Sequence, residues 1–160
     1  MAGWHQSYRQ RAFVAATSHY FSFVPTPPYY TELLGVSRQL LTEGRHELAV
    51  VVAQMAAELL VEQTITSVAA KKNAILPKRL LRRGQYLNAN LASPLVREFY
   101  TALTGDQIDS QPFWDKYDAH VARRDGIAHR GQRASAGEAQ ASCDATAQLI
   151  DHLERTHDLR

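Results

Sequence analysis

Arg124 and His129 are two residues whose types could together do chemistry on a phosphate. They lie in the stretch RRDGIAHRG, residues 123–131, and Asp125 follows the arginine directly. A guanidinium is always charged in proteins and binds phosphate oxygens with a fork of N–H donors. An imidazole accepts or donates a proton near neutral pH. Together the two groups supply what the cleavage of a phosphodiester bond needs.

The spacing of this pair leaves two interpretations open. Residues five apart in a regular helix point about 140° away from each other. Gly126 lies between the two residues, and glycine readily interrupts a helix. We therefore expect a break at Gly126 that lets Arg124 and His129 converge. The alternative is that the two are unrelated surface residues of a basic helix.

The chain as a whole has the composition of a globular protein. Its 160 residues are enough for one domain with a hydrophobic core, and 45% of them are hydrophobic. The formal net charge is only +2, so bulk charge does not indicate a nucleic-acid binder. The single cysteine fits a reducing compartment, and no signal-peptide pattern opens the chain. We expect a cytoplasmic protein.

Residues 48–61 are the longest apolar run. A membrane span needs roughly 20 apolar residues, and this run is shorter and interrupted by Gln54 and Glu58. We expect a buried helix with no membrane association. Leu48, Val52, Met55 and Leu59 recur at helical spacing in it, which is typical of a central helix.

Helical spacing and helix-end signals continue through the rest of the chain. Expected caps are Thr31, Ser93 before Pro94, Ser110, and Ser135 with Glu138 in a capping box, while Gly44 and Gly105 are expected terminators. These signals predict helices over residues 31–44, 45–73, 93–105, 110–131 and 135–160. The fold class that follows is an all-α bundle of four to five main helices.

The first thirty residues differ from the remainder. They contain eight of the fourteen aromatic residues and no acidic residue, and they close on the proline-rich PTPPYY. We expect an aromatic-rich N-terminal arm over residues 1–30, packed on a helical domain over residues 31–160.

Gln54, Glu58 and Glu62 form a narrow polar strip on the long helix, because they recur every four residues. One interpretation is that this strip faces solvent. The other is that Glu58 points into a cleft and orients Arg124, since a buried carboxylate needs a partner. His120 precedes Arg124 by four residues and is a minor candidate for the same site.

Six cations fall within residues 71–83 with no acidic residue among them. They are Lys71, Lys72, Lys78, Arg79, Arg82 and Arg83. Such a cluster could bind an RNA backbone without sequence preference, and Arg130 could add to it. The alternative is a solvated helix end, where Lys71 and Lys72 complement the negative pole of the long helix. The histidines show no spacing typical of a zinc site, so we expect no metal and no cofactor.

The predicted bundle, the long apolar helix containing Glu58 and the RDGIAHRG stretch together resemble the HEPN superfamily. The signature of that family is an arginine, four to six residues, and a histidine. A polar residue often follows the arginine and a glycine often follows the histidine. Arg124, Asp125, His129 and Gly131 match these places. The resemblance implies a helical domain that forms a homodimer in which two copies of the motif meet in one cleft.

Many HEPN members are metal-independent endoribonucleases in toxin–antitoxin, phage-defence or RNA-processing systems. The resemblance then implies that His129 transfers a proton, Arg124 stabilises charge on the phosphate and Asp125 positions one of them. The implied products are a 2′,3′-cyclic phosphate and a 5′-hydroxyl, so DNA is not cut. The implied partners are single-stranded RNA, a second copy, and an antitoxin or upstream partner domain.

Other HEPN members are non-catalytic, which keeps an alternative open. In a helical dimerisation module or one that binds RNA or protein, Arg124 would pair with a carboxylate and His129 would cap a helix end. A DNA-binding regulator is a third hypothesis, although the sequence shows no helix–turn–helix pair with a credible recognition helix.

Overall fold

The expected all-α fold is confirmed. The computed structural model describes residues 27–77, 80–82, 86–87 and 89–159, and within them five α-helices account for most of the chain. The N-terminal residues 1–26, which hold most of the expected aromatic arm, lie outside the described residues. The helices are α2 (Tyr29–Thr42), α3 (His46–Lys71), α4 (Pro94–Thr104), α5 (Trp114–Arg130) and α6 (Ala136–His157).

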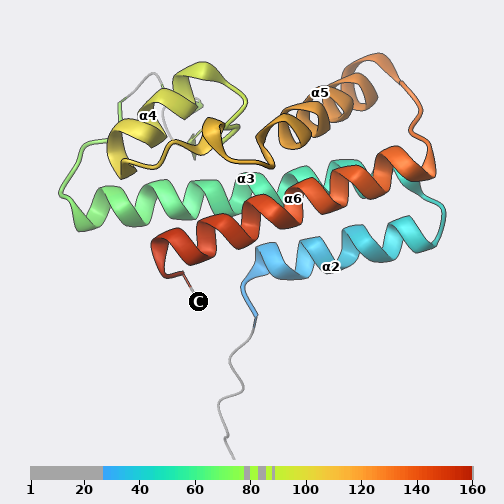
Figure 1. Ribbon diagram of the computed structural model, residues 1–160, viewed down its shortest axis with the longest axis horizontal. Coiled ribbons are helices and arrows are strands. Elements are labelled where there is room, and N and C mark those ends of the chain that lie inside the picture. The colour runs from blue at the N-terminus through green and yellow to red at the C-terminus, as the bar shows by residue number, and fades with distance from the viewer. Residues whose placement is uncertain (1–26, 78–79, 83–85, 88, 160) are drawn as a thin grey trace, which may run out of the picture.

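Three of these helices form a long layer. α2 turns back into α3, and α6 runs beside α3 in the same direction (Figure 1). α5 crosses over this layer, and α4 packs over the C-terminal half of α3. A short 3-10 helix, η2 (Ile108–Ser110), connects α4 to α5. The two-residue strands β1 (Leu81–Arg82) and β2 (Tyr86–Leu87) pair antiparallel and precede α4.

α3 is the central helix, as its apolar sequence predicts. It is long and apolar enough to cross a membrane by length and composition alone. More than half of its most apolar window is buried among the other helices, as in the core helix of a globular domain. The buried side chains include Leu60, Val61 and Ile65, which have no exposed surface.

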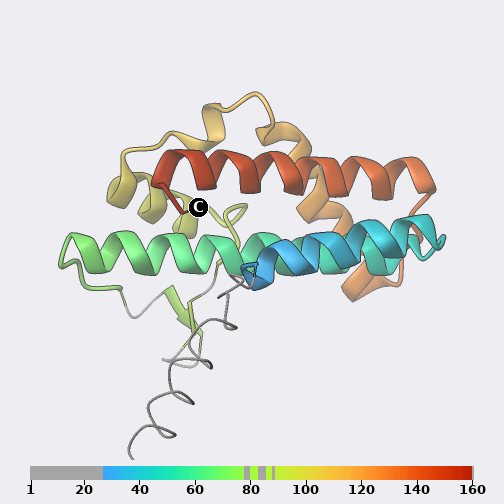
Figure 2. The same ribbon diagram turned by 90° about the horizontal axis from the view of Figure 1, so that it is seen from below.

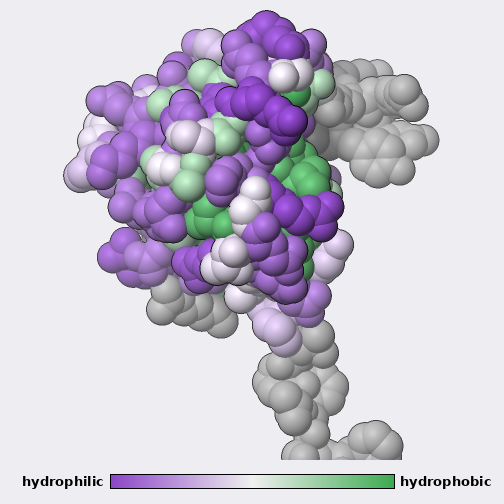
Figure 3. Space-filling view, turned by 90° about the vertical axis from the view of Figure 1, so that its right-hand side faces the viewer, coloured by the Kyte–Doolittle hydropathy of each residue, from purple (hydrophilic) through white to green (hydrophobic). Residues whose placement is uncertain are grey.

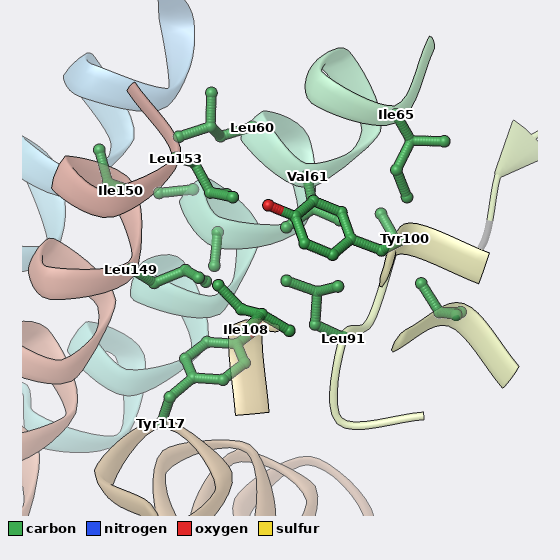
Figure 4. Close-up of a cluster of buried hydrophobic side chains, with 14 of the residues drawn as sticks. Leu60, Val61, Ile65, Leu91, Tyr100, Ile108, Tyr117, Leu149, Ile150 and Leu153 are labelled. Carbon is green, nitrogen blue, oxygen red and sulfur yellow. The ribbon is translucent and has the colours of Figure 1, made fainter. Parts of the chain in front are cut away.

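The main core lies between α3, α6 and the α4–η2–α5 segment. Leu149 and Leu153 of α6 and Tyr100 of α4 point toward the α3 side chains (Figure 4). Ile108 of η2 and Tyr117 of α5 complete the cluster from the other side. A smaller cluster joins Val50 of α3 to Ala134 and Ala139, with Ile127 of α5 packed against it. These contacts fix α5 against both α3 and α6.

Three of the expected helix ends are confirmed, the two ends of α4 and the start of α6. Ser93 and Pro94 open α4, and Gly105 ends it with a left-handed φ of 82°. Ser135 and Glu138 form the expected capping box at α6: the Glu138 N–H donates to Ser135 Oγ at 3.3 Å, and the Ser135 N–H donates to the Glu138 carboxylate at 2.8 Å.

Two expected helix starts were wrong. α2 begins at Tyr29 with Pro28 as its cap, because the Pro28 carbonyl still accepts the Thr31 N–H at 2.8 Å. α5 begins at Trp114, four residues after Ser110. Gln111 precedes a proline and is held in an extended conformation, which prevents the helix from starting at Ser110.

Candidate functional site

The expected break at Gly126 was wrong: α5 runs without interruption to Arg130. It ends at Gly131, whose φ is 64° and whose N–H donates to the Ile127 carbonyl at 3.2 Å. Glycine lowers helix propensity by only about 1 kcal/mol, which packing readily overrides. Gly126 is buried, and the Gln132 side chain lies where a Cβ at position 126 would be. The glycine therefore serves close packing at the end of the helix.

Arg124 lies on the inner face of α5. Tyr117, His120 and Arg124 follow helical spacing, and the first two are fully buried. The Arg124 Nη1 donates to an Asp125 carboxylate oxygen at 2.9 Å. Its Nε is buried and has no hydrogen-bond partner in the described part of the chain, while the side chain as a whole is 29% exposed. The guanidinium thus extends from the interior to the surface.

His129 lies in the last turn of α5 and is exposed. No hydrogen bond or ion pair joins its ring to another described residue. Asp125 lies one turn earlier, so its carboxylate is beside Arg124 and also on the side of the helix nearest to His129. His129 is therefore accessible to a ligand, whereas Arg124 is anchored.

His120 has no exposed surface and does not reach the outside of the bundle. Its Nε2 lies 3.4 Å from Thr146 Oγ1 of α6, and its Nδ1 has no partner within the described residues. Burial, and then the charges of Arg123 and Arg124, lower the pKa of His120 to about 4. His120 is consequently neutral at pH 7.

Glu58 does not pair with Arg124, contrary to one interpretation of the polar strip. Its carboxylate accepts a hydrogen bond from Gln54 Nε2 at 2.9 Å, while the carboxylate on Arg124 belongs to Asp125. Glu58 is half-buried near Tyr117, whose pKa is raised by burial and then by the Glu58 charge.

The solvent-facing interpretation of the same strip was also wrong at its first member. Gln54 is only 1% exposed, because it faces α5 rather than solvent. The apolar residues on the other side of α3 are turned outward instead, with Leu48 44% and Met55 48% exposed. Because α3 is apolar nearly all round, the hydropathy pattern does not determine which of its sides faces the core.

Contacts on one edge of α5 attach it to α6. Arg123 Nη1 donates to Ser142 Oγ at 2.7 Å, and its Nε lies 3.9 Å from the Glu138 carboxylate. The sequence did not indicate this attachment. Arg123 and Arg124 are adjacent arginines, and their residue types alone do not distinguish their roles. Arg123 is paired with Glu138 of α6 and Arg124 with Asp125, which leaves the exposed Arg130 as a cation of α5 with no ion-pair partner among the described residues.

The basic cluster is only partly within the described residues. Lys72 Nζ donates to the Leu103 carbonyl at 2.7 Å, in the last turn of α4. This contact is a structural one, in which a cation satisfies a helix C-terminus. Lys71 is exposed at the end of α3, and the backbone of Arg82 pairs with Tyr86. Lys78, Arg79 and Arg83 lie outside the described residues.

A second titratable cluster was not anticipated from the sequence. Tyr100 Oη donates to the Asp106 carboxylate at 2.6 Å and lies 2.8 Å from His157 Nε2. His152 Nε2 lies 2.8 Å from the same carboxylate. Burial, followed by the hydrogen bond to Asp106, raises the pKa of Tyr100. The cluster joins the α4–η2 turn to the end of α6, far from Arg124 in the chain.

Comparisons of the chain with protein-family models, with curated proteins and with solved structures give no match. Among the described residues, no group of three or more histidine, cysteine, aspartate or glutamate side chains is arranged to hold a metal ion. The functional assignment therefore depends on the geometry at the end of α5.

Proposed function

We propose that this chain is a metal-independent endoribonuclease of the HEPN type, with Arg124 and His129 in its site. The observation that supports it most is the presence of an anchored guanidinium and an accessible imidazole five residues apart near the end of one helix, on different faces of it. Asp125 holds Arg124 at 2.9 Å, and His129 is exposed one turn beyond Asp125. An electrostatic stabiliser and a proton-transfer group are the minimum that RNA cleavage by its own 2′-hydroxyl needs.

The proposed reaction transfers the phosphoryl group within the RNA. His129 accepts the proton of a ribose 2′-OH as the 2′-oxygen forms a bond to phosphorus. The bond from phosphorus to the 5′-oxygen breaks, and the proton held by His129 passes to that oxygen. Arg124 stabilises the negative charge that develops on the phosphate oxygens. The products are a 2′,3′-cyclic phosphate and a 5′-hydroxyl. The reaction uses no water molecule and needs no metal ion.

The uninterrupted helix makes a site within one copy unfavourable. Arg124 and His129 of the same copy point about 140° apart, so they cannot both face one phosphate. A site that joins Arg124 of one copy to His129 of a second copy avoids this problem. The proposal therefore includes a homodimer in which each RNA-cleaving site is shared between the two copies.

The test is cleavage of single-stranded RNA by the purified full chain in the presence of EDTA. We expect cleavage that survives chelation, yields cyclic phosphate ends and disappears in His129→Ala. A substrate with 2′-deoxyribose throughout should stay intact. Arg38→Ala is the matched control, because Arg38 is an exposed cation of α2 with no ion pair in the described residues. Intact RNA at all protein concentrations would argue against the proposal.

The structure also offers support for the non-catalytic alternative. Arg124 does pair with a carboxylate and buries its Nε, as a purely structural arginine would. In a helical binding module without catalysis, Arg124→Ala would lower the melting temperature strongly. The wild type and every variant would leave the RNA uncleaved. Our proposal expects His129→Ala to leave the melting temperature unchanged while it abolishes cleavage.

A further inference from the structure

Two neighbouring helices carry exposed apolar side chains along one shared edge. We define the α2–α3 face by the apolar residues on it, which are Tyr29, Val36, Leu48, Val52, Met55 and Leu59. Four of them are 44–60% exposed, and Val52 and Leu59 are partly buried. Figure 3 views the end of the bundle at which α2 turns into α3, and hydrophobic surface is visible there between hydrophilic side chains. Contiguous exposed apolar surface typically marks an interaction site.

The antiparallel packing of α2 and α3 brings these residues side by side. α2 folds back onto α3 through residues 43–45 and lies against it (Figure 2). Tyr29 is therefore about level with Leu59, and Val36 is about level with Val52. The α3 residues of the face span about 17 Å along the helix axis.

α6 covers the opposite edge of α2. Ser37 Oγ lies 3.0 Å from Cys143 Sγ of α6, and the charge of Arg38 also acts on that thiol. Val36 and Tyr29 leave α2 about 160–180° away from Arg38, on the edge that adjoins α3. The two helices thus form the face together, on the side away from α6.

We propose that residues 1–26 of the same chain cover the α2–α3 face. This segment contains six aromatic residues, which are Trp4, Tyr8, Phe13, Tyr20, Phe21 and Phe23. It is joined through Pro27 and Pro28 to Tyr29, which itself belongs to the face at its Leu59 end. Even wholly helical, 26 residues would reach about 39 Å, more than twice the length of the α3 part of the face. The segment therefore has both the position and the length to cover it.

The charges of the two surfaces favour the same occupant. Arg9 and Arg11 are the acid-free segment's only lysine or arginine residues. Over residues 29–36 and 48–62 the charged side chains are Glu32, Glu58 and Glu62, with no lysine or arginine among them. None of these three carboxylates has an ion-pair partner within the described residues. A basic, aromatic segment is complementary to an apolar face flanked by carboxylates.

A second copy of the chain is the competing occupant. A segment joined directly to the face acts at an effective concentration on the order of millimolar, about a thousandfold above a second copy at micromolar concentration. Docking within one chain also covers the aromatic segment and the face at once. A contact between the faces of two copies would leave both aromatic segments without an apolar partner. We therefore assign the face to the segment of its own chain.

The first test places a photoreactive residue, benzoylphenylalanine, at position 55 of the full chain. Unlabelled protein is mixed with heavy-nitrogen-labelled protein before irradiation, and the crosslinked peptides are identified by mass spectrometry. We expect crosslinks from position 55 to residues 1–26 in which both peptides carry the same label. The same photoreactive residue at Ala119, which is exposed on α5, is the matched control and should give no such crosslink.

The second test measures tryptic cleavage after Arg9 and Arg11 in the full chain. Met55→Lys should raise the cleavage rate at these two sites by about tenfold, because it places a charge beneath the docked segment and repels its arginines. Ala119→Lys should leave that rate unchanged. Because Met55 and Ala119 are both exposed in the described bundle, circular dichroism should show the same helix content in the wild type and both variants.

The docking does not depend on the proposed ribonuclease, so loss of RNA cleavage has no bearing on it. Crosslinks that join differently labelled peptides would overturn it, because the occupant of the face would then belong to another copy. The absence of crosslinks to residues 1–26, or equal tryptic cleavage in the wild type and Met55→Lys, would also overturn it.

Discussion

Arg124 and His129 leave the same uninterrupted helix on faces about 140° apart. Arg124 is anchored to Asp125 and partly buried, while His129 is exposed in the final turn. This divergence decides how the motif can work. In the proposed ribonuclease, one copy can present either the guanidinium or the imidazole to a given phosphate, and we therefore expect a second copy to supply the other group.

Gly131→Ala tests whether the end of α5 positions His129. Gly131 has a φ of 64°, in the region where a Cβ costs about 1–2 kcal/mol. We expect a loss of stability of that size in urea unfolding, together with reduced RNA cleavage. Gly137→Ala is the matched control, because Gly137 is helical, has open space around it and does not have a positive φ. The control should be neutral or slightly stabilising; equal losses in both variants would contradict this role of Gly131.

His120 should make the fold sensitive to acid. The folded state lowers its pKa from 6.5 to about 4, so the unfolded chain binds more protons between these pH values. The free energy of unfolding therefore falls as the pH falls, because protons bind the unfolded chain more readily. This effect of His120 amounts to about 2 kcal/mol between pH 7 and pH 5. Urea unfolding of the wild type and of His120→Gln at both pH values measures this. The variant should lose less stability on acidification, and parallel losses would show that His120 is not the responsible group.

The two helix-starting serines should differ in their contribution to stability. Ser135 accepts the Glu138 N–H through its side chain, whereas Ser93 makes no side-chain cap bond at α4. Ser135→Ala should cost about 1 kcal/mol in the free energy of unfolding. Ser93→Ala should cost clearly less, although both serines are N-caps by sequence. A similar cost at both positions would contradict the difference in capping.

Substitutions of the neighbouring Lys71 and Lys72 should distinguish a role in RNA binding from a role in stability. Lys72 donates to the Leu103 carbonyl at 2.7 Å, so Lys72→Ala should destabilise the fold by about 1 kcal/mol. Lys71→Ala should leave stability unchanged and weaken RNA binding at low salt, because Lys71 is exposed. Thermal melts and filter-binding at two salt concentrations distinguish the two effects. A loss of stability in Lys71→Ala together with weaker RNA binding in Lys72→Ala would contradict these roles.

Local signals in the sequence predicted much of the fold. Ser93, Pro94 and Gly105 bound α4 as expected, because these residue types act through their own backbone geometry. The capping box at Ser135 formed for the same reason. The start of α5 was misjudged because Pro112 acts on the residue before it, which outweighed Ser110 as a cap.

The orientation of α3 and the continuity of α5 could not be predicted from local signals. α3 is apolar nearly all round, so hydropathy does not say which side faces the core. Gln54 is inside because α5 brings Tyr117 against it, and Leu48 is outside because no described helix covers it. Gly126 remains helical because Gln132 packs over it, a contact that depends on the turn after α5.

A mixture of two inactive variants tests the shared site most directly. Arg124→Ala and His129→Ala copies, mixed so that they exchange subunits, should form mixed dimers with one intact site each. Because about half of the dimers are mixed and one of their two sites is intact, RNA cleavage should recover to about a quarter of the wild-type level. Cleavage that remains absent in the mixture, while the wild type cuts RNA under the same conditions, would contradict a site shared between two copies.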